Sequence, residues 1–477
     1  MTTYTVAQAL AAANSSTPLS GAAILDSAAD VRANLDALQP LAAAGEIAFV
    51  NFTDTTAPTI DVPFAQDQAD AAVIGMFEGQ RTVHITDATV AETFQIQSQQ
   101  HVSISVVDSG QAVESNIDAI SNIANEIANI TITDGTIPSF AASQMVNDSA
   151  VIGGITVAGI NAAKAVANLA AVQNIHGLAV TDTAADISTY ITGLQALATA
   201  GKLSSITLTD SGVPTIALSP AELAADGGAL GTIQGSSYVV SVDGGTANLS
   251  LTAPSGIATV LVLDGSPNQY SLTAAGDGKD FTVTDTSTGR TSTDHLSGFT
   301  ALQFDNGGTS AATTIFIASA TPSAGTVTSA DVAALYGAAL NREPDVSGLN
   351  FYEKFASSNP SVGITQYAAD FLSSKEYTGN PAHQYAQTPM GETQFVTDTY
   401  NDLLHRAPDS GGVNFYLTND INPMLANLTP GTAAYAAADL AAHALVVAEF
   451  SQSPEFRSDV GITAQNQASA SHWLLLV

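Results

Sequence analysis

Aspartates that recur in pairs at nearly constant spacing are the residues of this sequence best suited to chemistry. The first members of the pairs are Asp26, Asp108 and Asp182, and the second members are Asp54, Asp134 and Asp210. Carboxylate oxygens are the ligands that Ca²⁺ prefers, so the first members are candidate calcium ligands. The alternative interpretation is that an aspartate followed by Ser or Thr caps a helix or closes a turn.

Four other aspartates are candidate calcium ligands for the same reason: Asp277, Asp280, Asp345 and Asp409. The last two belong to a motif, Arg-x-Pro-Asp-x-x-Gly, that occurs twice. Its structural interpretation is a loop lock that holds two helices at a fixed angle. The proline sets a turn or the start of a helix, the aspartate accepts backbone N–H bonds, and the glycine allows close packing. The arginines, Arg342 and Arg406, would pair with the aspartate of their own motif or donate to carbonyl groups.

The paired aspartates belong to a threefold pattern in residues 1–245. A strand ends in Asp, an alanine-rich helix follows, and a second strand ends in Thr-Asp with proline four positions on. In the third copy, Ile187, Ile191 and Leu194 recur at helical spacing and predict a helix. Each unit has the predicted order strand-helix-strand-turn-strand-helix. We therefore expect an α/β repeat region of about three units, solenoid-like, in which each unit covers its neighbour's apolar face.

Two further regions follow, so the predicted class is α+β multidomain. Residues 246–320 alternate Thr, Gly and Asp with apolar residues and predict a small all-β hairpin module. Residues 318–328 are rich in Ser, Thr, Ala and Pro, which is typical of a linker. Residues 327–477 predict an all-α domain with an internal duplication, 327–380 and 390–460, in which the two copies of the motif align without a gap.

The duplicated motif, Leu-x-Arg-x-Pro-Asp-x-x-Gly-x-x-Phe-Tyr with a downstream Phe-x-x-Ser-x-Glu-aromatic, resembles an uncharacterised helical domain family. Its members are common near the C-termini of bacterial exoproteins, often beside RTX-type calcium-binding repeats and S-layer-like modules. The resemblance implies type I secretion, an extracellular or cell-surface location, and a structural or adhesive role. The family has no assigned activity, so it implies no catalytic residues. Residues 275–280 are similar to a single degenerate RTX repeat, which favours a hairpin turn over a calcium site.

The amino-acid composition limits the kinds of molecule that this protein can bind. The 477 residues include 44 acidic and 11 basic side chains, a net charge of −33. This charge repels nucleic acid and anionic membrane surfaces. There is no cysteine, so disulfides and thiolate metal sites are excluded. Few lysines with many Asp, Gly and Thr residues suit a protein that meets Ca²⁺ outside the cell.

Apolar segments and the two chain ends bear on membrane insertion and export. No stretch reaches the ~18 apolar residues that span a bilayer, so we expect no transmembrane segment. The first residues lack the basic and apolar parts of a signal peptide. The apolar end of the chain, residues 473–477, is either an export signal or a docked tail.

These observations predict a secreted protein of the cell surface that self-assembles into an S-layer-like, filamentous or biofilm-matrix structure and is not an enzyme. Ca²⁺ would assist by cancelling part of the negative charge. The expected partners are copies of itself and cell-surface polysaccharide. Two alternatives stay open: an extracellular adhesin that binds carbohydrate or a host surface without assembling, and an extracellular hydrolase with a carboxylate site.

Overall fold

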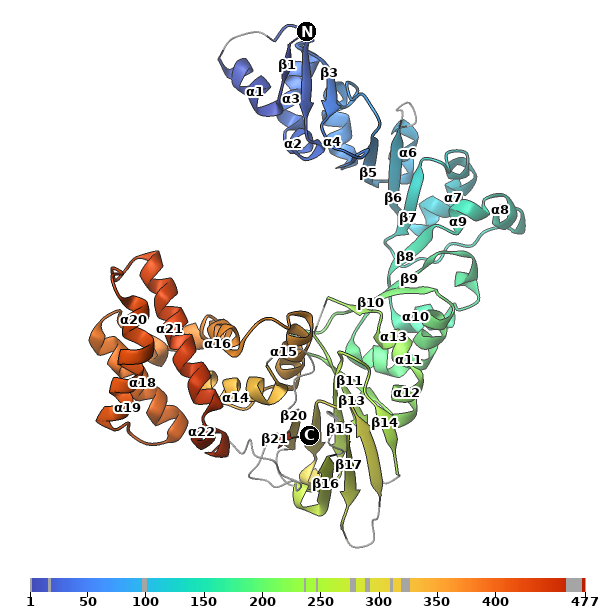
Figure 1. Cartoon of the computed structure of the whole chain (residues 1–477). Helices are drawn as coiled ribbons and strands as arrows, with labels where there is room; N and C mark the ends of the chain where they lie inside the picture. Colours follow the sequence, from blue (N-terminus) through green and yellow to red (C-terminus); the bar gives the residue numbers. More distant parts are fainter. Residues whose placement is uncertain are drawn as a thin grey trace. The chain divides into compact units, whose positions relative to one another are not determined.

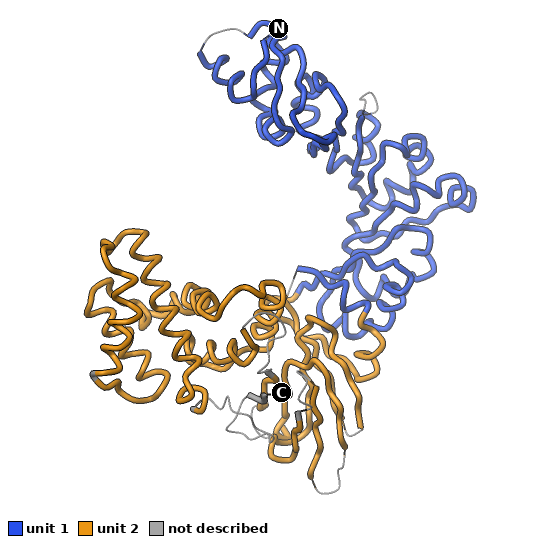
Figure 2. The backbone as a smooth tube through the Cα atoms, in the orientation of Figure 1, with its two compact units in different colours: residues 1–209, 228–235 blue, residues 210–227, 236–477 orange. Residues whose placement is uncertain are grey.

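The computed structural model describes residues 2–15, 19–96, 101–235, 237–245, 248–274, 280–287, 292–308, 312–318, 327–459 and 474–476. The chain forms two compact units, shown in Figure 2. Unit 1 comprises residues 1–209 and 228–235, and unit 2 comprises residues 210–227 and 236–477. Parallel sheets, small mixed sheets and a C-terminal helical region together confirm the predicted α+β multidomain class.

Unit 1 is built on parallel strands (Figure 1). One sheet has three strands in the order β1-β2-β3, and the other has eight in the order β12-β10-β9-β8-β7-β6-β5-β4. All the strand pairs in both sheets are parallel. The strands are β1 (Thr3–Tyr4), β2 (Ala22–Asp26), β3 (Ile47–Phe52), β4 (Thr59–Val62), β5 (Thr82–Ala88), β6 (Val102–Asp108), β7 (Ile127–Ile132), β8 (Ile155–Ile160), β9 (Gly177–Asp182), β10 (Leu203–Leu208) and β12 (Ile233–Gln234).

The helices of unit 1 alternate with the strands and pack on one face of the sheets. In β7, for example, Ile130 and Ile132 are buried, whereas the neighbouring Asn129 is exposed. The helices are α1 (Val6–Asn14), α2 (Ala28–Ala33), α3 (Leu35–Ala43), α4 (Phe64–Ala69), α5 (Ala71–Ile74), α6 (Val90–Ile96), α7 (Gly110–Ser121), α8 (Ala142–Asn147), α9 (Ser149–Ile152), α10 (Ala162–Ala167), a 3₁₀ turn (Ala171–Asn174) and α11 (Ala184–Thr199).

The side of the eight-stranded sheet opposite these helices is called the open face here. It consists of the outward-pointing side chains of successive strands. They include Asp61, His84, Ser105, Asn129, Thr131, Thr156, Ala179, Thr181 and Thr207. In-register pairing places several of them side by side across the sheet, including Thr131 with Thr156 and Thr181 with Thr207.

The first and third copies of the predicted repeat correspond element by element. Strands β3 and β4 match β10 and β11 (Thr215–Leu218), and helices α4 and α5 match α12 (Pro220–Ala225) and α13 (Gly227–Leu230). A side-chain contact also recurs in the two copies. Gln39 Oε1 accepts the Val73 N–H at 3.0 Å, and Gln195 Oε1 accepts the Ala229 N–H at 2.7 Å. The predicted helix near Ile187 is confirmed, and Ser219 with Glu222 forms a capping box at the start of α12.

The middle copy departs from the predicted order. No strand equivalent to β4 forms among its described residues 135–140, although Phe140 is buried. The outer copies have two buried apolar residues at alternating positions, Ile60 with Val62 and Ile216 with Leu218. The middle copy is two residues shorter here, because its helix-capping residue Ala141 follows Pro138 by three positions, whereas Pro63 and Ser219 follow Pro58 and Pro214 by five. The segment between the proline and the helix is therefore too short to hold a second buried residue at the alternating position, which falls on Ala142 inside the helix.

Unit 2 begins with two sheets. The six-stranded sheet has the order β11-β13-β15-β19-β20-β21, and the four-stranded sheet has the order β14-β18-β17-β16. The β16–β17 hairpin is antiparallel, as predicted. Because β11 and β13 precede residue 246, the compact unit starts earlier than the predicted all-β module. The remaining strands are β13 (Val239–Asp243), β14 (Ser250–Thr252), β15 (Ala258–Leu263), β16 (Tyr270–Ala274), β17 (Asp280–Asp285), β18 (Thr293–Ser297), β19 (Ala301–Phe304), β20 (Thr313–Ala318) and β21 (Leu474–Leu476).

The C-terminal part of unit 2 is helical. Its core is continuous with the sheet, since buried Val260, Ala301 and Phe316 cluster with residues of the helices. The helices are α14 (Ser329–Leu340), α15 (Val346–Ser358), α16 (Ile364–Leu372), α17 (Lys375–Thr378), a 3₁₀ turn (Pro381–His383), α18 (Pro389–Leu404), α19 (Ser410–Tyr416), a π turn (Leu417–Ile421), α20 (Asn422–Leu425), α21 (Ala433–Gln452) and α22 (Pro454–Asp459).

Two features bear on the membrane and export predictions. Of the helices that the structure describes, only α21 has the length and apolar composition of a membrane span. It contains Asp439 and His443, and its apolar residues contribute to the core of the helical region, as in a globular domain. Strand β21 pairs in parallel with β20, which corresponds to the docked-tail alternative for the chain end.

Candidate functional site

The three repeated strand-end aspartates lie in equivalent places. One carboxylate oxygen of Asp26 accepts the N–H of the next residue, and the other accepts the first N–H of helix α1 from Val6, both at 2.9 Å. In the same manner, Asp108 accepts the first N–H of helix α6 from Val90, and Asp182 accepts the first N–H of helix α10 from Ala162, each at 2.9 Å. Each carboxylate thus caps a helix of the preceding strand–helix unit, where the exposed N–H groups favour a negative charge. The capping interpretation is confirmed, while calcium binding by these residues stays a prediction.

The second members of two aspartate pairs also cap helices. Asp54 accepts the N–H of Ala28 at 2.8 Å, and Asp134 accepts that of Gly110 at 3.2 Å. Asp87, which the sequence analysis did not single out, accepts the N–H of Phe64 at 2.6 Å. The repeat region therefore uses a strand-end carboxylate to join consecutive units. Of the remaining candidates, Asp280 begins β17, and Asp277 lies outside the described residues.

The two Arg-x-Pro-Asp-x-x-Gly motifs form matching locks in the helical region. Asp345 accepts the Gly348 N–H and Asp409 accepts the Gly412 N–H, both at 2.7 Å, so each aspartate is an N-cap. The main partner of each arginine is a more distant glutamate. In the first half, Arg342 donates to both oxygens of Glu376 at 2.6 and 2.9 Å.

The second arginine repeats this contact with the glutamate of its own half. Arg406 donates to the two oxygens of Glu455 at 2.7 and 2.9 Å. The predicted pairing of Arg342 with Asp345 is a secondary contact of 3.6 Å. The glutamates come from the Phe-x-x-Ser-x-Glu-aromatic ends of the two halves, so each lock ties the start of a half to its end.

An aromatic cluster supports each lock. In the first half, Tyr352 stacks on Phe371 and Tyr336 meets the same ring edge-on, each with ring centroids 4.8 Å apart. In the second half, Tyr416 and Tyr400 surround Phe450 with centroid distances of 5.0 Å. The arginine of each half lies over the tyrosine ring that precedes it. The recurrence of these contacts indicates that the motif specifies the fold of a helical unit.

A polar array on the open face has the connectivity of a hydrolase triad. His84 Nδ1 lies 2.8 Å from Asp61 Oδ1, and its Nε2 lies 2.8 Å from Ser105 Oγ, which also accepts a hydrogen bond from Asn129. The exposed fractions of these residues do not suit nucleophilic catalysis, because Ser105 is only 6% exposed whereas the Asp61 side chain is 50% exposed. A catalytic serine must reach its substrate. The array therefore best fits cross-strand stabilisation of the face.

Among the described residues, one group of three ionisable side chains brings its ligand atoms close together, and it lies in the second helical half. Glu392 of α18 and two residues of α21, Asp439 and His443, bring their ligand atoms within 4.8 Å of one another. His443 Nε2 is 2.7 Å from Glu392 Oε2 and 3.6 Å from Asp439 Oδ1. Asp439 and His443 share a face because they are four positions apart on one helix.

This group, called the Glu-Asp-His cluster here, is shielded from water. The side chains of Glu392, His443 and Asp439 are 3, 12 and 17% exposed. Burial, and then the negative charge of Glu392, raise the pKa of Asp439 to about 6 although His443 opposes this. Burial and the charges of Glu392 and Asp439 likewise raise the pKa of Tyr435, one turn before Asp439. The cluster is thus a buried region of negative potential.

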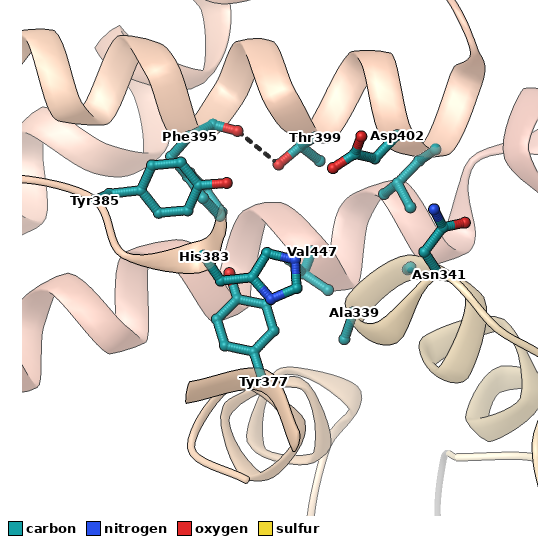
Figure 3. Close-up of a pocket in the computed structure, with 11 residues that line it drawn as sticks. Ala339, Asn341, Tyr377, His383, Tyr385, Phe395, Thr399, Asp402 and Val447 are labelled. Atoms are coloured by element: carbon teal, nitrogen blue, oxygen red, sulfur yellow. Dashed lines mark hydrogen bonds between the residues drawn. The ribbon is translucent and has the colours of Figure 1, made fainter. Parts of the chain in front are cut away.

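A small cavity lies between the two helical halves (Figure 3). It has a volume of about 30 Å³ and is lined by Tyr377, His383, Tyr385, Thr399 and Asp402 among others. This volume suits one water molecule rather than an organic substrate. The Phe395 ring also lines it and stacks on His443 with a centroid distance of 3.7 Å, so cavity and cluster share a wall.

Sequence reasoning missed the Glu-Asp-His cluster. A signal was present, because Tyr435, Asp439 and His443 recur every four positions on a single predicted helical stretch. The third member, Glu392, comes from another helix, and no sequence spacing indicates that contact.

A comparison with known protein families finds no match, and no similar protein is found among curated proteins.

Proposed function

We propose that this chain is a secreted structural protein of the bacterial cell surface that assembles with copies of itself and has no catalytic role. The observation that carries this proposal is the open face of unit 1. Parallel sheets are usually covered on both faces, whereas in strands β5, β7 and β8 buried apolar side chains alternate with side chains that are partly or fully exposed. Solenoid proteins commonly bind partners through extended surfaces of this kind.

Charge supports contact at this face. The whole chain has a net charge of −33, but strands β7, β8 and β10 contain no charged residue. Two of the strand-end aspartates, Asp108 and Asp182, point their oxygens at helix N-termini. Copies can therefore meet across the open face with little local repulsion. Ca²⁺ would assist by neutralising carboxylates elsewhere on the surface.

The location and export route rest on the resemblance of the duplicated helical motif to domains of bacterial exoproteins. In this proposal the helical region is a docking or anchoring module, and type I secretion delivers the chain to the layer, filament or matrix. The locks at Arg342 and Arg406 would keep its two halves intact outside the cell.

Light scattering with negative-stain imaging tests assembly. The wild-type chain is expected to form assemblies in millimolar Ca²⁺ and to disperse in excess EGTA. The double variant Asn129→Arg with Thr207→Arg places like charges on the open face and should prevent assembly. Ala185→Arg, at an exposed position of α11, is the matched control and should assemble normally. A wild-type chain that stays monomeric in both conditions would refute the proposal.

A second candidate function is adhesion without self-assembly. The hydroxyl, amide and imidazole groups of the open face are donors and acceptors of the kind that recognise carbohydrate hydroxyls. Binding to polysaccharide by a monomeric wild-type chain, lost in the same double-arginine variant, would favour an adhesin. A serine hydrolase would require a reactive Ser105, and a fluorophosphonate probe is expected to leave this residue unlabelled.

A further inference from the structure

We propose that the Glu-Asp-His cluster binds one divalent transition-metal ion, with Glu392, Asp439 and His443 as its protein ligands. This site is separate from the open face and from the candidate calcium aspartates. Three potential ligand atoms from two helices converge within 4.8 Å. Two of the ligands, on α21, are fixed one helical turn apart, and the third is held by the facing helix α18.

Charge balance is the first argument for a cation. Glu392 and Asp439 place two carboxylates beside a single imidazole in a shielded position, and a divalent ion would balance the two carboxylates. No lysine or arginine in the described part of the chain forms an ion pair with Glu392 or Asp439. Asp439 Oδ1 is buried, and no described residue donates a hydrogen bond to it. A buried carboxylate oxygen without a donor is costly, and a metal ion would remove that cost.

The donor atoms select the kind of metal. Calcium favours six to eight oxygen ligands, which this group of one nitrogen and two carboxylates does not provide. Zinc takes mixed nitrogen and oxygen ligands at about 2.0–2.2 Å. Ligands at that distance in a tetrahedron are roughly 3.4 Å apart. The Nε2 to Oδ1 distance of 3.6 Å already fits, and Glu392 would need to retreat from its present 2.7 Å contact with Nε2.

The neighbouring side chains favour a defined site. Phe395 stacks on the imidazole of His443 with a centroid distance of 3.7 Å and an interplanar angle of 15°, which fixes the ring plane. Tyr435 is 5% exposed and lies one turn before Asp439 on α21. An ordered shell of this kind reduces the reorganisation that metal binding requires.

The duplication offers an internal comparison. In the alignment that superposes Arg406 on Arg342, Glu392 corresponds to Thr328 of the first half, which is the N-cap of α14. In the alignment that superposes Phe450 on Phe371, the counterparts of His443 and Asp439 are Ile364 and Pro360. The first half therefore folds around its lock without any of the three ligands. The cluster is an addition to the helical unit and not a requirement of its fold.

The test uses the full-length, tag-free chain, stripped with a chelator and dialysed against Zn²⁺. Mass spectrometry is expected to find one tightly held Zn²⁺ per chain, which a large molar excess of Ca²⁺ does not displace. Asp439→Asn and Glu392→Gln should each weaken Zn²⁺ binding by about tenfold or more. Glu449→Gln, at an exposed position on the same helix, is the matched control and should bind as the wild type does.

Thermal unfolding keeps the proposal testable if a variant is less stable. Zn²⁺ should raise the unfolding midpoint of the wild type and of Glu449→Gln, but not that of Asp439→Asn or His443→Gln. In the presence of chelator, Asp439→Asn should be at least as stable as the wild type, because it removes a buried like charge. A wild type that binds no Zn²⁺, or an Asp439→Asn variant that binds it equally well, would overturn the site and identify the cluster as an ion pair only.

Discussion

The two helical halves are alike in their locks and different in their buried polar groups. Both halves have the arginine–glutamate pair, the aspartate cap and the aromatic cluster. Among the described residues, only the second half has the Glu-Asp-His cluster, whereas the first has a buried aspartate, Asp331, where the second has Phe395. Features that recur in both halves specify the helical unit. Features present in one half show where the duplicated unit has been specialised.

The largest change in the free energy of unfolding is expected on replacing Asp331, the buried group found only in the first half. It accepts hydrogen bonds from the Thr328 N–H at 2.8 Å and from Gln452 at 3.0 Å, and it contacts Arg457. Asp331→Asn should lower the free energy of unfolding by about 3 kcal/mol, because it leaves the partly buried Arg457 without its counter-charge. Chemical denaturation measures the loss. Asp398→Asn, on α18, is the control and should change stability by less than about 0.5 kcal/mol.

The pH dependence of this variant sharpens the prediction. Burial alone would raise the pKa of Asp331, but hydrogen bonds from Thr328 and Gln452 and the charge of Arg457 outweigh burial and lower the pKa below its ordinary value of 3.8. The stabilisation is therefore fully present above that value and is lost as the pH falls through the lower, folded-state pKa. The difference in the free energy of unfolding between the wild type and Asp331→Asn should therefore become smaller as the pH falls below that folded-state pKa. An unchanged difference would show that Asp331 acts through its shape and not its charge.

The glycines of the two locks should show the next largest effect. A Cβ at Gly348 would overlap the Tyr336 hydroxyl, and one at Gly412 would overlap the Tyr400 hydroxyl. Gly348→Ala should cost about 2 kcal/mol of unfolding free energy because the packed tyrosine must move. In Gly411→Ala the nearest contact is Asp409 Oδ1 at 3.2 Å, so alanine's helix preference should leave that variant as stable as the wild type or more so. Equal stabilities for Gly348→Ala and Gly411→Ala would contradict the lock.

A smaller effect is expected at the caps of the repeat region, which are the recurring features of unit 1. Asp182→Ala removes the acceptor for the N–H groups of Ala162 and Thr183, at a cost of about 1–2 kcal/mol. Asp182→Asn keeps an acceptor and should recover part of the loss. Both measurements are made with and without Ca²⁺. A loss that appears only in Ca²⁺ would favour the calcium alternative over the capping interpretation.

Replacing the arginine of either arginine–glutamate pair should change the free energy of unfolding least. Arg342→Lys keeps the charge but loses the two-point contact with Glu376, and about 0.5 kcal/mol should be lost because both side chains are substantially exposed. Arg406→Lys should have a weaker effect, since Arg406 is the more exposed of the two arginines. A double-mutant cycle with Glu376→Gln measures the coupling, which should decrease with added salt. A coupling that salt does not change would mean that the arginine acts mainly by packing on Tyr336.

Local chemistry explains how much could be predicted from the sequence. The helix at Ile187 and the β16–β17 hairpin follow from patterns between neighbouring residues, and both are confirmed. Contacts between distant segments leave no such pattern. The Arg342–Glu376 pair and the approach of Glu392 to His443 depend on how helices pack, so sequence spacing could not predict either.

The repeat region illustrates the same limit. The sequence predicts three similar units, and helix capping is one of the two roles it indicates for their aspartates. The structure adds that each cap holds the helix of the preceding unit, a contact between segments that are distant in the sequence. In the middle copy, residues 135–140 form no strand because the helix-capping residue follows the proline by three positions, whereas it follows by five in the other two copies.

In this account the recurring polar groups hold each helical unit, and the Glu-Asp-His cluster, which lies in the second half, binds a metal ion. Thermal unfolding of Asp409→Ala and Glu392→Gln, each with and without Zn²⁺, tests this most directly. Asp409→Ala should unfold at a lower temperature than the wild type in both conditions and keep the full Zn²⁺-induced rise, whereas Glu392→Gln should lose that rise. The claim is contradicted if Asp409→Ala loses the Zn²⁺-induced rise or if Glu392→Gln retains it.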